Sequence, residues 1–122
     1  MKKVLIIEDD EQVARVYTIK LKQEGIETIG AVDGEAGLEK IVSEKPDLVL
    51  LDLMLPKKDG FWVLGEMAKA PALKKISVIV LSNLGQEQDK ERALKLGAKD
   101  YLVKSDISIK EVVEKIKKYL AP

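Results

Sequence analysis

The sequence predicts an α/β fold with three layers, in which helices cover both faces of a parallel sheet. Short runs rich in Val, Ile and Leu are typical of strands that are buried on both faces of such a sheet. Segments with helical spacing of apolar residues separate these runs, and parallel strands joined by helices require right-handed crossovers. The clearest apolar runs are Val4–Ile7, Leu48–Leu51, Val78–Leu81 and Tyr101–Val103.

The first half of the chain contains three predicted strands and two predicted helices. A helix follows the first strand and ends near Gly25, because glycine commonly terminates helices. Residues 26–31 form the second strand and residues 47–52 the third. Asp33 is the expected N-terminal cap of the helix between them, which ends before Pro46. The apolar residues with helical spacing are Val13, Val16, Tyr17 and Leu21 in the first helix and Leu38, Ile41 and Val42 in the second.

The second half continues the same alternation. Asp59 follows a turn and is expected to cap a third helix that runs through Met67. The fourth helix ends at Gly97. Ser108 and Glu111 match a capping box, which opens the last helix. The other predicted elements are a strand over residues 76–81, a helix over about residues 86–96, a strand over residues 99–103 and a final helix that ends at Leu120.

Composition excludes several classes of protein. The 122 residues include 21 basic and 21 acidic side chains, so the chain lacks the basic footprint of a nucleic-acid binder. The absence of cysteine and histidine excludes disulfides, thiol chemistry and the commonest zinc ligand. The first apolar run is only four residues long and ends in acids, which fits neither a signal peptide nor a membrane span. We therefore expect a cytoplasmic protein.

Each of the four apolar runs ends in a polar residue that can take part in chemistry. The residues are Glu8 and Asp9 after the first run, Asp52 after the second, Ser82 after the third and Lys104 after the fourth. Ligands of open parallel sheets bind beyond the carboxyl ends of the strands, so these side chains are expected to converge. Three acids, a hydroxyl and an ammonium suit a divalent cation and a phosphoryl group. This placement also favours the first and third strands as neighbours.

The sequence closely resembles the receiver domain of bacterial two-component response regulators. The resemblance covers essentially the whole chain and implies a single domain over residues 1–122, with the flavodoxin-like strand order 2-1-3-4-5 and five helices. The motifs that carry it are Val4-Leu5-Ile6-Ile7-Glu8-Asp9-Asp10, Leu50-Leu51-Asp52-Leu53-Met54-Leu55-Pro56 with Asp59-Gly60, Val80-Leu81-Ser82, and Asp100-Tyr101-Leu102-Val103-Lys104.

The acidic residues then acquire expected roles. Asp52 is the expected phosphoacceptor, because a carboxylate can attack phosphorus and form an acyl phosphate; the alternative is a helix-capping or turn aspartate. By resemblance, Asp9 and Asp52 bind Mg²⁺ directly, Met54 contributes its backbone carbonyl, and Glu8 acts through a water. Mn²⁺ is expected to substitute. Glu8 could instead be a solvated acid, and Asp10 is expected to cap the first helix.

The remaining site residues carry the switch. Lys104 is expected to neutralise phosphate charge and to pair with Asp52 or Asp9 before phosphorylation; otherwise it is a surface lysine. By resemblance, Ser82 is the switch hydroxyl and Tyr101 its partner, which moves inward when Ser82 is drawn toward the phosphate. The alternatives are a turn serine and a static, half-buried tyrosine with its hydroxyl in water.

Two positions depart from the family pattern. Ser105 stands where the family usually has proline, and a cis bond before a non-proline residue costs about 2.5–4 kcal/mol, so we predict a trans bond after Lys104 and an altered loop. Asn83 stands where the family usually has a small residue, and we expect it to alter phosphorylation and dephosphorylation rates. Trp62 is expected to be partly exposed, since Phe61 and Leu64 are better core candidates.

The resemblance implies a phosphorylation-controlled signalling switch rather than an enzyme, although it assists its own phosphorylation and dephosphorylation. The expected partners are a sensor histidine kinase or histidine phosphotransfer protein and an unknown downstream protein, with no direct binding of nucleic acid or membrane. Some relatives dimerise through the fourth helix, fifth strand and fifth helix. The chain is a stand-alone receiver or part of a longer regulator.

Two other functions are considered. The first is a constitutive interaction module in which Asn83 and Ser105 have disabled switching. The second is a phosphatase with an aspartate nucleophile. That chemistry usually has an acid two residues after the nucleophile, and Met54 at this position cannot transfer protons.

Overall fold

The computed structural model describes residues 1–122 and contains one five-stranded parallel sheet. The strand order is β2-β1-β3-β4-β5, as the resemblance to receiver domains implied. All neighbouring strands pair in parallel, and β1 lies between β2 and β3, so the first and third strands are neighbours as predicted. The strands are β1 (Lys3–Ile7), β2 (Glu27–Ala31), β3 (Leu48–Leu51), β4 (Ser77–Ser82) and β5 (Asp100–Val103).

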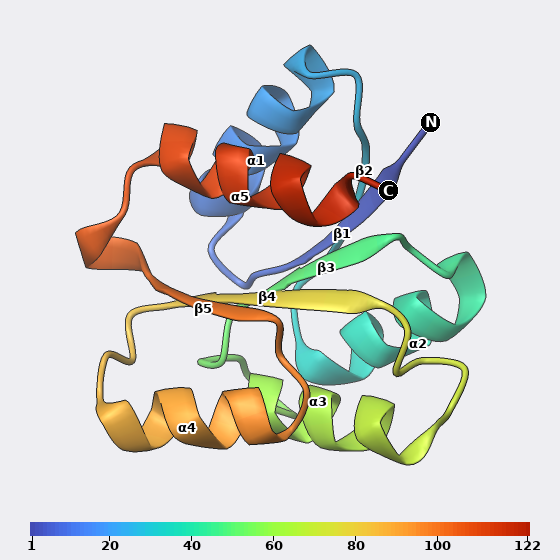
Figure 1. Ribbon diagram of the computed structural model, residues 1–122, viewed down its shortest axis with the longest axis vertical. Coiled ribbons are helices and arrows are strands. Elements are labelled where there is room, and N and C mark those ends of the chain that lie inside the picture. Colours follow the sequence, from blue (N-terminus) through green and yellow to red (C-terminus); the bar gives the residue numbers. More distant parts are fainter.

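Five α-helices cover the two faces of the sheet. Figure 1 shows α1 and α5 on one face and α2, α3 and α4 on the other. The loops that follow β1, β3, β4 and β5 all lie at the left of this view, at the carboxyl ends of the strands. The helices are α1 (Glu11–Gln23), α2 (Gly34–Glu44), α3 (Gly60–Lys69), α4 (Glu87–Lys95) and α5 (Ile109–Leu120).

The predicted caps begin four of the five helices. The carboxylates of Asp10, Asp33 and Asp59 accept backbone N–H bonds at the starts of α1, α2 and α3. Ser108 and Glu111 form the predicted capping box of α5. Only α4 begins without a side-chain cap. Because these bonds satisfy N–H groups that have no partner within the helix, the local sequence determines where each helix starts.

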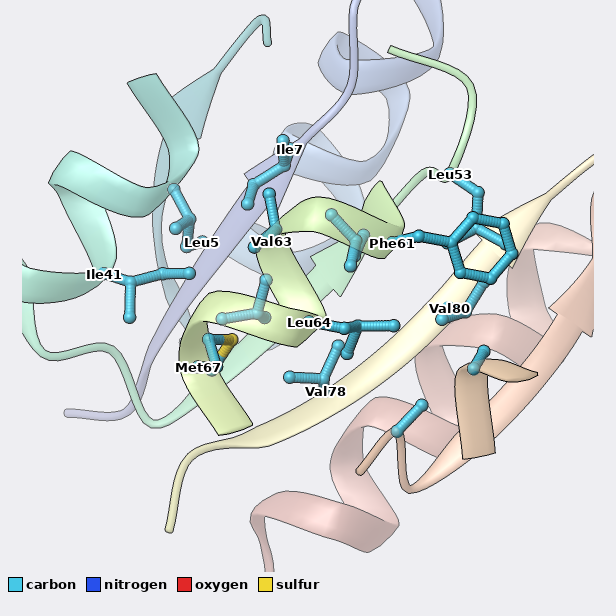
Figure 2. Packing of buried hydrophobic residues seen from close by; sticks show 14 of the residues in the cluster. Leu5, Ile7, Ile41, Leu53, Phe61, Val63, Leu64, Met67, Val78 and Val80 are labelled. Carbon is cyan, nitrogen blue, oxygen red and sulfur yellow. The ribbon is translucent and has the colours of Figure 1, made fainter. Parts of the chain in front are cut away.

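The sheet separates two hydrophobic clusters, and successive residues of each strand enter opposite ones. Leu5 and Ile7 of β1 face α2 and α3, whereas Val4 and Ile6 face α1 and α5. Figure 2 shows the first cluster, in which side chains of α3 pack on the face of the sheet against side chains of β1 and β4. Burial on both faces explains why the strands read as continuous apolar runs. Val42, expected on the apolar side of α2, is 55% exposed, whereas Ile41 is buried in the core and Leu38 packs against it.

The chain after β5 bears on the prediction made for Ser105. Residues 104–106 form a short 3₁₀ helix, η1 (Lys104–Asp106), before α5 begins. Every peptide bond is trans, including Lys104–Ser105, as predicted. None of the helices combines the length and apolar character that crossing a bilayer requires.

Candidate functional site

The strand register brings the predicted site residues to one edge of the sheet. Ile7 pairs with Leu51, so Glu8 and Asp52 leave adjacent strands side by side. Ser82 pairs with Val103, which places Lys104 one residue beyond the end of the same pair. The convergence inferred from four separate apolar runs is therefore present, because all four strands are parallel and end at this edge.

Three carboxylates form the acidic part of the site. Oxygen atoms of Glu8, Asp9 and Asp52 all lie within 4.8 Å of one another. Glu8 and Asp52 are only 5% and 6% exposed, whereas Asp9 is exposed to solvent. Carboxylates this close repel one another, and a hard divalent cation with oxygen ligands relieves that repulsion. The donor set therefore fits Mg²⁺ or Mn²⁺.

Lys104 lies between the two buried acids. Its Nζ donates to Oε1 of Glu8 at 2.6 Å and to Oδ2 of Asp52 at 2.9 Å. The sequence analysis expected Asp52 or Asp9 as its partner; Asp52 is confirmed, and the second partner is Glu8 instead of Asp9. Asp9 is exposed, and Glu8 is the acid that is buried at the end of β1 beside β3. A surface position for Lys104 is excluded, since its side chain is 19% exposed.

Burial and charge both shift the acid–base properties of this group. Burial raises the pKa of Glu8, and the nearby charge of Asp52 raises it further. The hydrogen bonds from Lys104 and from the backbone N–H of Asp10 act to lower this pKa but do not outweigh burial. Burial also acts to lower the pKa of Lys104, but Glu8 and Asp52 outweigh it, and the net pKa is raised. Lys104 is therefore a permanent cation at neutral pH.

Hydrogen bonds to β1 and to the turn that follows β3 hold Asp52 in place. Its N–H donates to the carbonyl of Ile7 at 3.1 Å, and its Oδ1 accepts the N–H of Met54 at 3.1 Å. Asp52 thus makes a local turn, as one alternative reading proposed, but it does not cap α3, since Asp59 does. One carboxylate oxygen bonds to the turn and the other to Lys104.

Ser82 and Tyr101 are connected through Leu84. Ser82 is completely buried, and its Oγ accepts the N–H of Leu84 at 3.4 Å. The hydroxyl of Tyr101 donates to the carbonyl of Leu84 at 2.5 Å. Tyr101 is 7% exposed, so the alternative of a half-buried ring with its hydroxyl in water is wrong. The ring of Tyr101 is therefore buried, with its hydroxyl bonded to the protein.

The residues that depart from the family pattern lie at the rim. Asn83 and Ser105 are both exposed, next to Ser82 and Lys104 in the chain. Trp62 is partly exposed, as predicted, and the ammonium of Lys58 lies 5.6 Å from the centre of its ring. Phe61 and Leu64 are buried in the core, also as predicted.

The sequence analysis missed one participant in the site entirely. The carbonyl of Leu84 links Ser82 to Tyr101, and a backbone carbonyl leaves no signal in the residue type. The sequence did contain a signal for the pairing of Glu8 with Lys104, because Glu8 directly follows a buried strand. The strand beside it in the sheet ends in Asp52, the other partner of Lys104. Strand adjacency had to be known before that signal could be used.

The comparisons with known proteins agree with this geometry. The family model described as "Response regulator receiver domain" matches residues 4–117. A curated relative, the DNA-binding dual master transcriptional regulator RpaA of Synechocystis sp., is 38% identical over 98% of this chain and 49% of its own length. The chain spans about half the length of the curated relatives it matches.

Two solved structures illustrate the similarity in fold. The receiver domain of the Francisella response regulator 1452 is 32% identical, with a TM-score of 0.90, over 98% of this chain and 97% of that one. The Mn²⁺-bound form of response regulator Rcp1 is 34% identical, with a TM-score of 0.83, over 97% of this chain and 91% of that one. Fold, strand-end residues and family match agree, and the chain belongs to the response regulator receiver domain family.

Proposed function

We propose that this chain is a phosphorylation-dependent signalling switch that accepts a phosphoryl group on Asp52. The observation that carries the proposal is the arrangement around that carboxylate. Asp52 is buried at the end of β3, bonded to Lys104, and within 4.8 Å of the carboxylates of Glu8 and Asp9. A nucleophilic carboxylate beside a cation and a metal-binding set suits phosphoryl transfer.

Mg²⁺ is the proposed metal, with Mn²⁺ as a substitute. Asp9 and Asp52 would bind it directly, Met54 through its backbone carbonyl, and Glu8 through a water. Mn²⁺ in the structure of the relative Rcp1 supports this choice. When bound, the ion would neutralise charge on the phosphoryl oxygens.

The transfer itself needs no general base. The phosphodonor is a histidine kinase, a histidine phosphotransfer protein or a small molecule. An oxygen of ionised Asp52 attacks phosphorus in line, the bond from phosphorus to the donor breaks, and the electron pair leaves with the donor. Lys104 already donates to Asp52 and would move to a phosphoryl oxygen as charge builds there. Asn83 lies at the rim, where it is expected to alter the rates of phosphorylation and dephosphorylation.

The proposed switch passes through the β4–α4 loop (residues 83–86). If the Ser82 hydroxyl donates to a phosphoryl oxygen, its contact with the N–H of Leu84 changes. The carbonyl of Leu84 in turn accepts the Tyr101 hydroxyl, so the change reaches β5. We therefore expect phosphorylation to shift populations of the surface formed by α4, β5 and α5, and with it the affinity for a downstream protein.

Several finer points belong to the same proposal. Residues 1–122 act as one receiver unit in the cytoplasm, without direct contact with membrane or nucleic acid. The unit assists its own phosphorylation and dephosphorylation without being an enzyme in the usual sense. The α4–β5–α5 face is the proposed surface for a downstream partner or a second copy.

The test is the intact mass before and after incubation with acetyl phosphate and Mg²⁺. We expect one added phosphoryl group, which is lost in Asp52→Asn and when Mg²⁺ is omitted. The matched control is Asp106→Asn, the same change at an exposed acid, and it should gain the group as the wild type does. Uptake by Asp52→Asn, or uptake independent of Mg²⁺, would contradict the proposal.

A wild type that gains no mass calls for a second measurement with beryllofluoride, which mimics the acyl phosphate without hydrolysing. Binding of beryllofluoride would indicate a short-lived phosphate and retain the proposal. No binding would favour the constitutive interaction module instead.

A further inference from the structure

The start of α2 touches the loop that follows Asp52. The N–H of Gly34, the first residue of α2, donates to the carbonyl of Lys58 at 2.9 Å. A Cβ at Gly34 would lie 2.1 Å from that carbonyl oxygen and 2.7 Å from the carbonyl carbon. These are backbone atoms, so no side chain fits at Gly34 unless α2 or the loop moves.

Asp33 makes a second contact between the same two segments. It is 7% exposed, and its Oδ1 accepts the N–H of Ala36 at 2.8 Å as the cap of α2. Its Oδ2 lies 3.8 Å from the ammonium of Lys57. The backbone of Lys57 has a φ of +64°, in the left-handed region that residues other than glycine rarely adopt. A loop with this conformation depends on contacts that hold it in place.

The β3–α3 loop (residues 53–59) is also attached at both of its ends. At its start, the N–H of Asp52 donates to Ile7, and at its end, the N–H of Gly60 donates to the carbonyl of Leu53. Both end contacts come from elements next to the loop or paired with it. The contacts at Lys57 and Lys58 come instead from the start of α2, which follows β2, and β2 is not a neighbour of β3.

We propose that Gly34, together with Asp33, is a positioning residue for metal binding, because it fixes the β3–α3 loop that carries the backbone carbonyl of Met54. This inference rests on the proposed function, in which that carbonyl is a metal ligand. A backbone ligand cannot adjust through a side-chain rotamer, so its place depends on the course of the loop. Partners that orient metal ligands typically change metal affinity by about 10- to 100-fold when mutated.

The test is Gly34→Ala, with Mg²⁺ affinity of the unphosphorylated protein measured by titration calorimetry. We expect affinity to fall about tenfold, and amide hydrogen exchange across residues 53–59 to become faster. Phosphorylation by acetyl phosphate should be slow at low Mg²⁺ and return to within about twofold of the wild-type rate at saturating Mg²⁺, since Asp52 and Lys104 are unchanged.

Gly37→Ala is the matched control, the same substitution three residues further along α2. Its Cβ would meet the side-chain end of Ile7 at 2.6 Å, and its three nearest neighbours are all Ile7 side-chain atoms rather than atoms of the loop. This variant is expected to lose stability while keeping its Mg²⁺ affinity and the slow exchange of the loop. Equal loss of affinity in both variants, or unchanged affinity in Gly34→Ala, would overturn the proposal.

Asp33→Asn keeps the proposal testable if Gly34→Ala does not fold. The amide oxygen still accepts from Ala36, while the charge that faces Lys57 is lost. Faster exchange over residues 53–59 is expected, and unchanged exchange would overturn the proposal. A wild type that binds no Mg²⁺ would refute the proposed function itself. Failure of the positioning role alone leaves Mg²⁺ binding of the wild type intact and appears only in the comparison between the variants.

Discussion

At the residue scale, Glu8 shows that the proposed site for metal and phosphate opposes the stability of the fold. Its carboxylate is buried and lies close to Asp52, and both conditions raise its pKa. The ammonium of Lys104 offsets part of this penalty through a 2.6 Å bond. An acid whose pKa is raised by folding is a destabilising group whenever it is ionised.

The pH dependence of Glu8→Gln tests this interpretation. The folded state binds the Glu8 proton more tightly than the unfolded state, so the penalty is present above the raised pKa and vanishes as pH falls below the ordinary value of 4.5. In EDTA at pH 7 we expect Glu8→Gln to raise the free energy of unfolding by about 1 kcal/mol. The gain should shrink as the pH is lowered, as measured by urea unfolding at several pH values.

Glu91→Gln is the control for this experiment, since Glu91 is an exposed acid on α4. Its unfolding free energy should stay within about 0.5 kcal/mol of the wild type at every pH. A Glu8→Gln protein that is less stable than the wild type at pH 7 would mean that the bond to Lys104 outweighs the burial of the acid.

At the element scale, capping bonds determine where helices begin and therefore how they approach the sheet. The capping box of Ser108 and Glu111 begins α5 directly after the loop that carries Lys104. Val112 and Ile116 of α5 are fully buried against β1, β3 and β4. The start of α5 thus affects both the core and the path of the chain away from the site.

Ser108→Ala removes the acceptor for the N–H of Glu111. We expect a loss of about 1 kcal/mol in the free energy of unfolding, because a helix N–H then lacks its partner. The measurement is the midpoint of urea unfolding, with an unchanged slope. Ser43→Ala, an exposed position within α2, should leave the midpoint unchanged or slightly higher, and an equal loss there would rule out the cap as the cause.

At the scale of the whole molecule, the site joins both hydrophobic layers. Glu8, Asp52 and Lys104 follow strands whose side chains enter the cluster under α2, α3 and α4 and the cluster under α1 and α5. A ligand at this edge binds only when three strands are in register. Binding at the site is therefore linked to global unfolding.

Mg²⁺ should stabilise the entire fold through this linkage. At a concentration 100 times Kd we expect a gain of about 2.7 kcal/mol, measured by thermal unfolding and reversed by EDTA. Asp9→Asn is the informative variant, because Asp9 is exposed and its side chain makes no ion pair within the chain. Its stability in EDTA should equal that of the wild type, and its gain from Mg²⁺ should be largely lost. A full gain in Asp9→Asn would exclude Asp9 as a ligand.

Much of the fold could be read from the sequence because the signals are local. Asp33, Asp59 and Ser108 cap helices within four residues of themselves, and the helix ends expected at Gly25 and Gly97 have the positive φ that glycine allows. Strand order is not local. The acids at the ends of the first and third strands indicated that these two are neighbours, and the full order came from the resemblance to a known family. The exposure of Val42 was not apparent, because helical spacing alone does not show how a helix is rotated on the sheet.

By itself, the sequence determined the alternation of strands and helices, their caps, and which side chains stand at the strand ends. These properties depend on residues that are neighbours along the chain. Only the tertiary structure decided that Lys104 binds Glu8, 96 positions away, that Tyr101 binds the carbonyl of Leu84, and that Gly34 leaves room for Lys58. Such contacts depend on how packed layers bring distant segments together, and a backbone carbonyl or an absent side chain has no chemical signature in the sequence.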